Sequence, residues 1–229
     1  MAKPESKSNK HKKEINMNRL ESDGYVSFEW ADGEAKRVLF VGNSITRHGV
    51  CPPIGWLNDW GMAASDISKD YVHRTSSILS EKYGPVSIGI TNCGDWEREY
   101  WKDGILENHH AARDFGADIV VIRIGENIDR SKLAQHDLAG RFEDMIRYFA
   151  SSPSAKVIVT DLFWHSEALD ALIVGLCRKN GWTFVTIGDL GDKPEMKALG
   201  LFEHQGVANH PSDEGMEQIA RRICDAALS

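Results

Sequence analysis

The sequence has few of the features that mark membrane-spanning, secreted or metal-binding chains. No apolar stretch approaches the roughly 20 residues that span a bilayer, and the polar, basic start has no apolar segment of a secretory signal. The cysteines form no Cys-x-x-Cys pair, which argues against a zinc ribbon or a disulfide framework. We therefore expect a cytoplasmic protein with reduced cysteines and no transmembrane segment.

The charge of the chain is unevenly distributed. The net charge is −7, yet residues 1–20 hold six basic and two acidic residues, a balance of +4. The remainder therefore carries about −11, which disfavours nucleic acid as the main partner. Because residues 1–20 also lack apolar clusters, we expect a disordered basic N-terminal arm ahead of a single domain over residues 21–229.

Apolar runs alternate with helical patterns along the chain. A short alternating segment at residues 25–30 predicts an edge strand. Continuous apolar runs then predict buried parallel strands at residues 37–41, 86–91, 118–124, 156–162 and 182–187. Helical spacing predicts helices over residues 71–83, 133–150, 167–180 and 213–228. Right-handed crossovers between such strands predict a three-layer α/β/α sandwich with a mostly parallel sheet of about five strands.

Two familiar catalytic loops are missing after the first buried run. Gly42-Asn43-Ser44 is followed by Ile45-Thr46, so this segment is not the Gly-x-Ser-x-Gly nucleophile elbow. It also lacks the glycine-rich patterns that bind dinucleotides or phosphates. The strand is succeeded instead by a lone serine in a turn.

Four residues are candidates for a catalytic site because of where they stand relative to the predicted elements. Ser44, Gly94 and Asn127 each follow the end of a predicted strand, and His210 precedes Pro211 ahead of the last helix. Each alone fits an ordinary turn residue. Because the carboxyl ends of parallel strands meet at one rim of the sheet, the four can converge there. The hydroxyl of Ser44 then suits a nucleophile, the amide of Asn127 an oxyanion donor and the imidazole of His210 a general base.

The order and placement of Ser44, Gly94, Asn127 and His210 resemble the SGNH/GDSL hydrolase family over about residues 36–227. The resemblance implies a flavodoxin-like sandwich and a serine esterase, lipase, thioesterase or carbohydrate deacetylase. It also implies an oxyanion held by the N–H groups of Ser44 and Gly94 and the Asn127 amide, with no metal or organic cofactor. The family's Gly-Asp-Ser and Gly-x-Asn-Asp blocks are altered, because Asn43 and Ile128 replace the acids.

One further departure concerns the histidine. The family usually has an aspartate three residues before it, and Val207 stands there in this chain. We consider three substitutes for that acid: Glu203 from the preceding loop, a backbone carbonyl, or Asp213. Glu203 and the carbonyl rank equally. Asp213 ranks lower because its place in the first turn of a helix already explains it.

Four tryptophans stand close in sequence to the candidate site residues and could indicate the kind of substrate. Trp56 and Trp60 follow the candidate serine, and Trp96 and Trp101 follow the candidate glycine. If they flank the pocket they can stack on a sugar ring, and otherwise they pack in the core. We expect a small-molecule ester, an O-acetyl group on a carbohydrate, with a lysophospholipid or thioester as the alternative. A catalytically weak member that binds glycan or protein, and a nucleotide or flavin binder, are the other functions considered.

Overall fold

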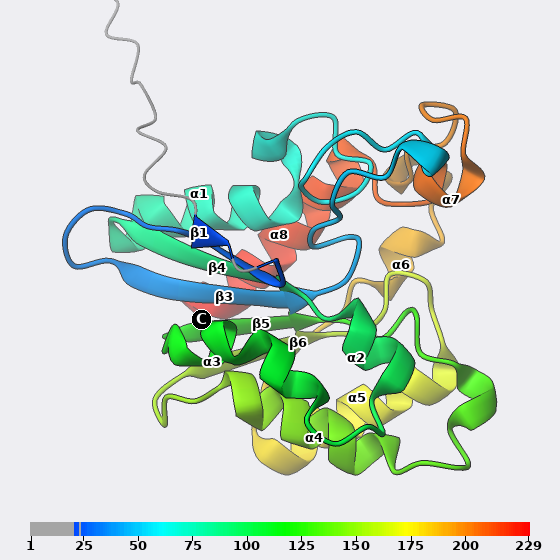
Figure 1. The fold of residues 1–229 in the computed structure, drawn as a ribbon. Helices are drawn as coiled ribbons and strands as arrows, with labels where there is room; N and C mark the ends of the chain where they lie inside the picture. The colour runs from blue at the N-terminus through cyan, green and yellow to red at the C-terminus, as the bar shows by residue number, and fades with distance from the viewer. Residues whose placement is uncertain (1–20, 23) are drawn as a thin grey trace, which may run out of the picture.

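The computed structural model describes residues 21–22 and 24–229, so the expected basic arm at residues 1–20 lies outside the described residues. Within them the chain forms one sheet with the strand order β1-β2-β4-β3-β5-β6-β7 (Figure 1). The strands are β1 (Glu21–Ser22), β2 (Val26–Glu29), β3 (Lys36–Gly42), β4 (Val86–Asn92), β5 (Ile119–Arg123), β6 (Lys156–Thr160) and β7 (Thr183–Val185).

Helices cover both faces of the sheet (Figure 1). One face carries α1 (Tyr71–Tyr83) and α8 (Asp213–Leu228), and the other carries α2 (Gly94–Glu99), α3 (His110–Asp114), α4 (Leu138–Phe149) and α5 (Glu167–Asn180). Shorter helical segments lie in the connections: η1 (Pro52–Ile54), η2 (Ile67–Lys69), η3 (Ile105–His109), η4 (Arg130–Lys132), α6 (Gly188–Gly191), η5 (Pro194–Met196) and α7 (Gln205–Ala208). None of the helices described here is both long and apolar enough to cross a membrane.

The predicted three-layer sandwich is confirmed. Strands β4, β3, β5, β6 and β7 are parallel neighbours, in the order of the flavodoxin-like folds. The predicted edge strand is β2, which pairs antiparallel with β4 and extends the sheet together with β1. The order in which successive strands are added reverses at β3, because β4 lies on one side of it and β5 on the other. In such sheets a crevice forms at the carboxyl ends of the strands on either side of this switch point.

Burial on both faces explains why the central strands read as continuous apolar runs. Along β3, Val38 and Phe40 pack into the cluster under α1 and α8, whereas Leu39 and Val41 pack into the cluster under α4 and α5. All four are fully buried. A strand with one solvent-exposed face would show alternating apolar and polar residues instead.

Helix boundaries follow capping chemistry. Helices α1, α5 and α8 have the predicted bounds, and Ser212 caps α8 by accepting a hydrogen bond from the N–H of Gly215 at 3.2 Å. The predicted start of α4 at residue 133 is wrong, because the helix begins at Leu138. The Asp137 carboxylate accepts from the Gly140 N–H at 2.9 Å and fixes the start there.

A charged histidine ties the edge strand to the helical layer. The ring nitrogens of His73 on α1 lie 2.7 Å from the Asp70 carboxylate and 2.8 Å from that of Glu29 on β2. Burial opposes a charge on the ring, but the hydrogen bonds to both carboxylates outweigh it and raise the pKa of His73 to about 10. The imidazolium therefore cross-links β2 and α1 at neutral pH.

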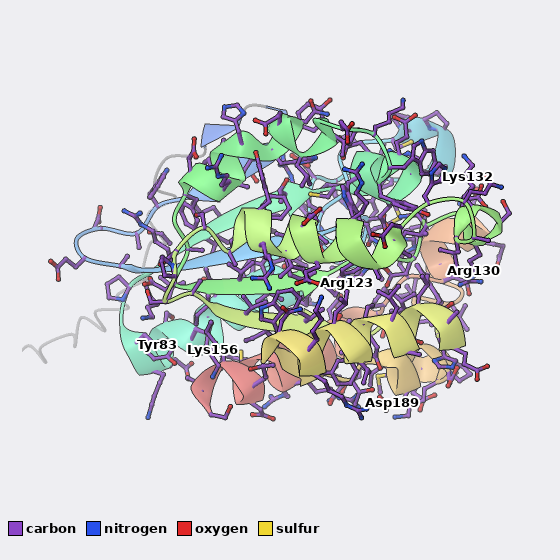
Figure 2. The ribbon with its side chains drawn as sticks, turned by 90° about the horizontal axis from the view of Figure 1, so that it is seen from below. Tyr83, Arg123, Arg130, Lys132, Lys156 and Asp189 are labelled. Atoms are coloured by element: carbon purple, nitrogen blue, oxygen red, sulfur yellow. The ribbon has the colours of Figure 1, made fainter. Side chains whose placement is uncertain are left out.

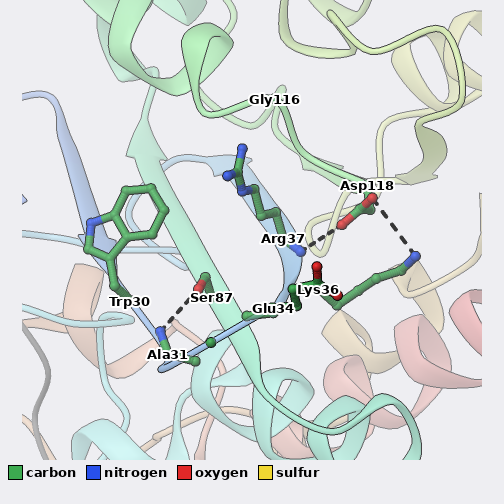
Figure 3. A pocket seen from close by; sticks show the side chains of 10 residues that line it. Trp30, Ala31, Glu34, Lys36, Arg37, Ser87, Gly116 and Asp118 are labelled. Carbon is green, nitrogen blue, oxygen red and sulfur yellow. Dashed lines mark hydrogen bonds and ion pairs between the residues drawn. The ribbon is translucent and has the colours of Figure 1, made fainter.

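The amino ends of the parallel strands border a hollow of about 560 Å³ (Figure 3). Several of its polar groups are paired with one another. The Arg37 N–H donates to the Asp118 carboxylate at 2.8 Å, Lys36 lies 3.9 Å from the same carboxylate, and the Ala31 N–H donates to Ser87 at 3.0 Å. The candidate site residues lie at the opposite rim of the sheet.

Candidate active site

A pocket of about 360 Å³ lies at the carboxyl ends of the central strands. Ser44, Gly94, Asn127 and His210 all line it, so the fold brings the four predicted residues together. They come from the turns after β3, β4 and β5 and from the segment between α7 and α8. The remaining lining residues are Asn43, His48, Ile54, Met62, Asn92, Arg98, His204, Gly206 and Val207.

Ser44 and His210 are hydrogen-bonded to each other. The serine Oγ lies 2.8 Å from Nε2 of the imidazole, and Nδ1 lies 2.7 Å from the carbonyl oxygen of Gly206. A carbonyl can only accept, so Nδ1 carries the proton and Nε2 presents its lone pair to the hydroxyl. This tautomer is the one in which the imidazole can remove the serine proton.

The histidine is held by backbone and ring contacts. Its N–H donates to the carbonyl of Val207 at 2.9 Å, and its own carbonyl accepts from the N–H of Ala198 at 3.0 Å. The ring of Trp164 packs edge to face against the imidazole, with centroids 5.1 Å apart. The sequence reasoning missed this tryptophan, since no spacing connects it with His210.

The environment of His210 keeps its ring neutral. Burial, together with the positive charge of Arg123 and the nearby His48, lowers the pKa of His210 to about 4. No carboxylate is hydrogen-bonded to this ring in the part of the chain described. At neutral pH the imidazole is therefore a free base.

The structure distinguishes the three substitutes for the missing acid. The Gly206 carbonyl occupies the position at Nδ1, whereas Glu203 is exposed and has no hydrogen bond to His210 within residues 24–229. Asp213 is engaged elsewhere: its two oxygens accept from the N–H and the hydroxyl of Ser65 at 2.8 and 2.7 Å. Val207 is fully buried in an apolar cluster with Trp56, which explains why this position holds no acid.

The serine stands on a tight turn after β3. The carbonyl of Asn43 accepts from the N–H groups of Thr46 and Arg47 at 2.9 and 3.0 Å. The turn folds back so closely that a Cβ on Gly42 would overlap the Thr46 hydroxyl and come within 2.7 Å of the Arg123 carbonyl. Glycine is therefore required at the end of this strand.

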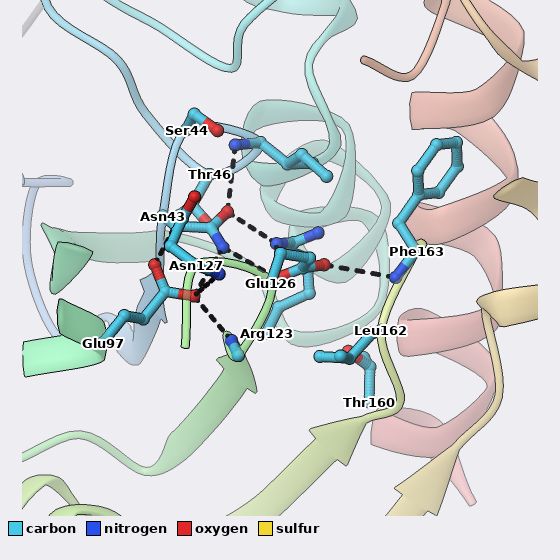
Figure 4. A network of polar contacts seen from close by, with 12 residues as sticks. Asn43, Ser44, Thr46, Glu97, Arg123, Glu126, Asn127, Thr160, Leu162 and Phe163 are labelled. Carbon is cyan, nitrogen blue, oxygen red and sulfur yellow. Dashed lines mark hydrogen bonds and ion pairs between the residues drawn. The ribbon is translucent and has the colours of Figure 1, made fainter. Parts of the chain in front are cut away.

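Beneath the serine lies a buried polar network (Figure 4). The Asn43 amide nitrogen donates to the Glu97 and Glu126 carboxylates at 3.0 and 2.7 Å, and its oxygen accepts from Arg123 at 2.6 Å. Arg123 also donates to Glu126 at 2.8 Å. An aspartate at position 43 could not donate to either carboxylate, which explains why this chain has asparagine where the SGNH/GDSL pattern that its sequence resembles has an acid.

Glu97 fixes the asparagine at the third strand end. Its Oε2 accepts from the side-chain amide of Asn127 at 2.6 Å, and its Oε1 accepts from the N–H groups of Asn127 and Gly125 at 3.2 and 2.7 Å. Burial and the nearby charge of Glu126 raise the pKa of Glu97. One hydrogen of the Asn127 amide remains for a ligand, since the nitrogen carries two.

Three donors were predicted for an oxyanion, and they differ in availability. The N–H of Ser44 has no protein acceptor within the described residues. The N–H of Gly94 donates to the side-chain oxygen of Asn92 at 2.9 Å. The Asn127 side chain is exposed at the pocket with one hydrogen unused. Two donors are thus free, and the third is shared with Asn92.

The tryptophans do not form a platform for a ligand. None of the residues that line the pocket is a tryptophan. Trp56 and Trp96 are buried in the apolar clusters, the Trp60 ring N–H donates to the Ala64 carbonyl at 2.9 Å, and Trp101 stacks on His136 with centroids 4.5 Å apart. Their large number reflects packing around the site rather than contact with a substrate.

The sequence did contain a signal for the buried network. Arg123 stands at the end of a strand whose other residues are apolar, and a charge in a buried strand requires partners. The structure places its side chain in the interior, away from peripheral charges such as Arg130 and Asp189 (Figure 2). The partners Glu97 and Glu126 lie in different segments, so no local spacing could identify them.

The comparisons with known proteins agree with this fold. No family model and no curated protein matches the chain. Among solved structures, a protein from Bacteroides ovatus described as a GDSL-like lipase is 13% identical, with a TM-score of 0.54 over 86% of this chain and 99% of that one.

Two carbohydrate esterases are also similar in structure. A family two enzyme from Clostridium thermocellum, solved with cellohexaose, is 14% identical, with a TM-score of 0.53 over 86% of this chain and 65% of that one. A family 3 enzyme from Talaromyces cellulolyticus is 17% identical, with a TM-score of 0.51 over 84% and 96%. At these identities the likeness concerns the fold, and the chain has the predicted fold of the SGNH/GDSL hydrolases.

Proposed function

From the premise of an SGNH/GDSL hydrolase fold, we propose that this protein is a serine esterase that removes a small O-acyl group, an acetyl group, from a carbohydrate. The observation that carries the proposal is the 2.8 Å contact between Ser44 Oγ and Nε2 of an imidazole whose other nitrogen is fixed by a carbonyl. A nucleophile, a base in the correct tautomer and free amide donors then share one pocket.

In the acylation step, His210 takes the proton of Ser44 as the hydroxyl oxygen attacks the ester carbonyl carbon. The C=O electron pair moves onto oxygen, where the Ser44 N–H and the Asn127 amide donate to it. The Gly94 N–H adds a third hydrogen bond when Asn92 releases it. Collapse of the intermediate breaks the ester C–O bond, and the imidazolium protonates the leaving alcohol. Water then attacks the acyl-serine by the same path and restores Ser44.

The carbonyl partner of His210 affects one part of this cycle. In a serine protease the aspartate both selects the tautomer and stabilises the imidazolium, and its replacement by asparagine lowers turnover about 10⁴-fold because the wrong tautomer is held. The Gly206 carbonyl selects the correct tautomer here. It offers only a dipole to the imidazolium, so we expect a moderate loss of turnover rather than an inactive protein.

The pocket supports a small acyl group. Ile54, Met62 and Val207 supply its apolar lining, and its volume of about 360 Å³ leaves little room for a long chain beside an alcohol. The choice of a carbohydrate alcohol is supported by the two carbohydrate esterases of similar fold.

Hydrolysis of p-nitrophenyl acetate tests the proposal. We expect Ser44→Ala to lower kcat/KM by at least about 10³-fold, and a serine-directed phosphonate to label Ser44 alone. Ser154→Ala is the matched control, because this exposed serine lies in the turn before β6 at the other rim. Full activity in Ser44→Ala would refute the proposal, and acetate release from a panel of acetylated sugars would identify the alcohol.

A further inference from the structure

The active-site pocket differs in charge from the protein that contains it. The chain carries a net charge of −7, yet none of the described residues that line the pocket has a carboxylate. The lining includes Arg98 and three histidines, His48, His204 and His210. The side chains that line the pocket are thus neutral or basic. The carboxylates beneath the serine, Glu97 and Glu126, are buried and already accept hydrogen bonds from neighbouring donors, so the open lining favours an anionic ligand over a cationic one.

Arg98 is the fixed positive charge in this lining. Its side chain comes from α2 and turns back over the glycine at the start of that helix: a Cβ on Gly94 would lie 3.3 Å from Nη1 and 3.7 Å from Nη2. Arg98 is exposed and makes no hydrogen bond or ion pair with any other residue in the described part of the chain. The guanidinium thus stands beside a predicted oxyanion donor with all its N–H groups available.

Two carboxylates, Asp95 and Asp59, line a hollow together with Arg98, and both are bound to other partners. Asp95, one turn earlier on α2, accepts from the ring of His109 at 2.9 Å and from the Asn108 amide at 3.0 Å. Asp59 forms two hydrogen bonds with Arg47, at 2.9 and 2.7 Å. Neither acid is hydrogen-bonded to Arg98, so its planar fork remains open to a ligand.

A second hollow, of about 500 Å³, continues from the pocket past Arg98. The two share Asn92 and Arg98 in their linings. The second is also lined by Arg47, by Val50 and by the carboxylates of Asp59 and Asp95, whose hydrogen bonds to other partners are given above. With the acyl group on the apolar lining of the first pocket, the alcohol part of an ester would extend from Ser44 towards Arg98 and this hollow.

We propose that Arg98 binds an anionic group, a carboxylate or a phosphate, on the alcohol part of the substrate, and that the protein selects acidic O-acyl esters. This inference rests on the proposed function for the identity of the ester bond. The pairing of a guanidinium fork with a carboxylate or phosphate is direct and geometrically specific. Arg98 is thus a specificity determinant rather than a member of the reacting pair.

Binding is measured first, without turnover. In Ser44→Ala, calorimetry compares 4-acetoxybenzoate, 4-acetoxyphenyl phosphate and the neutral 4-acetoxybenzamide. We expect at least one anionic ester to bind about 10-fold more tightly than the amide, a value reduced by the exposure of the arginine. Which of the two anions gains more identifies the preferred group. Adding Arg98→Gln should abolish the difference, Arg98→Lys should retain part of it, and 0.5 M NaCl should weaken it.

Turnover then separates substrate binding from oxyanion stabilisation. With Ser44 intact, the preference is kcat/KM for the anionic ester divided by kcat/KM for the neutral 4-acetoxybenzamide. We expect Arg98→Gln to lower this preference about 10-fold by raising KM for the anionic ester. Arg178→Gln is the control, since this exposed arginine lies in the last turn of α5, near the amino ends of the strands. Equal losses of kcat for both esters would overturn the inference, because Arg98 would then act on the oxyanion.

The two proposals fail in different ways. If the anionic preference appears in binding but no ester is hydrolysed, the function is wrong and the role of Arg98 holds. If esters are hydrolysed with no anionic preference, the role of Arg98 is overturned and the function holds. Failure of the anionic esters to bind Ser44→Ala at millimolar concentration also overturns the role of Arg98.

Discussion

Replacing Asn43 by aspartate would introduce the acid that the SGNH/GDSL pattern has before its serine, and we expect the change to destabilise this protein. The Asn43 amide donates to Glu97 and Glu126, at 3.0 and 2.7 Å. Asn43→Asp removes both hydrogen bonds and places a third carboxylate against the two that are already buried. Only Arg123, which donates to the Asn43 oxygen at 2.6 Å, gains from the new charge.

The size of the effect follows from the hydrogen bonds lost. A hydrogen bond to a charged group contributes about 1.5–3 kcal/mol. Asn43→Asp loses two such hydrogen bonds, and the stronger attraction between the new carboxylate and Arg123 offsets part of that loss. We therefore expect the free energy of unfolding to fall by about 3 kcal/mol. For a chain of this length the melting temperature falls by about 2–4 °C per kcal/mol, which gives about 6–12 °C.

Thermal unfolding at two pH values measures this loss. A third carboxylate beside Glu97 raises the pKa of Glu97 further in the folded state, as burial and the charge of Glu126 already do. A carboxyl whose pKa is raised destabilises the fold above its unfolded pKa, and the penalty shrinks as pH falls through the folded value. The deficit of Asn43→Asp should therefore be larger at pH 8 than at pH 5.

A second substitution tests the cause. In Asn43→Asp with Glu126→Gln, position 126 supplies the amide donor and one carboxylate is removed, so we expect about half of the lost stability to return. Asn180→Asp is the control, since this residue accepts from Arg147 in either form and loses only the neutral hydrogen bond from its amide to the Leu176 carbonyl. Its effect should stay below about 1 kcal/mol. A melting temperature of Asn43→Asp within 2 °C of the unsubstituted protein, or no rescue by Glu126→Gln, would refute the reasoning.

Three further outcomes are expected. Because the pKa of His210 is lowered to about 4, the acid limb of kcat/KM should lie near pH 4, and a limb near 6.5 would contradict the buried neutral base. The pKa of His73 is raised to about 10, so its contribution to stability is complete below pH 6.5 and is lost as pH rises through 10. The free energy of unfolding, measured by denaturation, should therefore fall by about 3 kcal/mol between pH 7 and 10, and His73→Gln should lack this fall. Gly42→Ala should lower stability by about 2 kcal/mol and activity with it, whereas Gly175→Ala, where a Cβ meets no atom within 4 Å, should raise stability slightly in urea titrations.

Local pattern was enough to predict the layers and the rim of the sheet. The apolar run that ends at Gly42 is buried on both faces, and such a run predicts a central parallel strand whose end faces the crevice. Turn residues after three such runs, with a histidine before the last helix, then share a rim by topology alone. Periodicity alone could not locate the start of α4. The apolar spacing extends back to residue 133, but Asp137 caps the helix, which begins at Leu138.

The parts of the site that could not be predicted depend on contacts between distant segments. Glu97 reaches back across the sheet rim to Asn43 and Asn127, and nothing in its own neighbourhood indicates that role. The orienting group of His210 could be narrowed to a few possibilities, but a backbone carbonyl has no sequence signature. Only the conformation of α7 puts the Gly206 oxygen at Nδ1.

That main-chain partner determines which mutations can affect the proposed catalytic pair, Ser44 and His210. Alanine scanning removes side chains only, so a scan of the residues other than glycine within 203–209 would leave the acceptor of His210 in place and identify no orienting residue. Damage would come instead from changes in the path of the chain, such as a proline or an insertion within α7, which would carry the oxygen away while every reacting side chain stayed intact. Loop engineering, rather than point substitution of polar residues, is the way to separate orientation from proton transfer here.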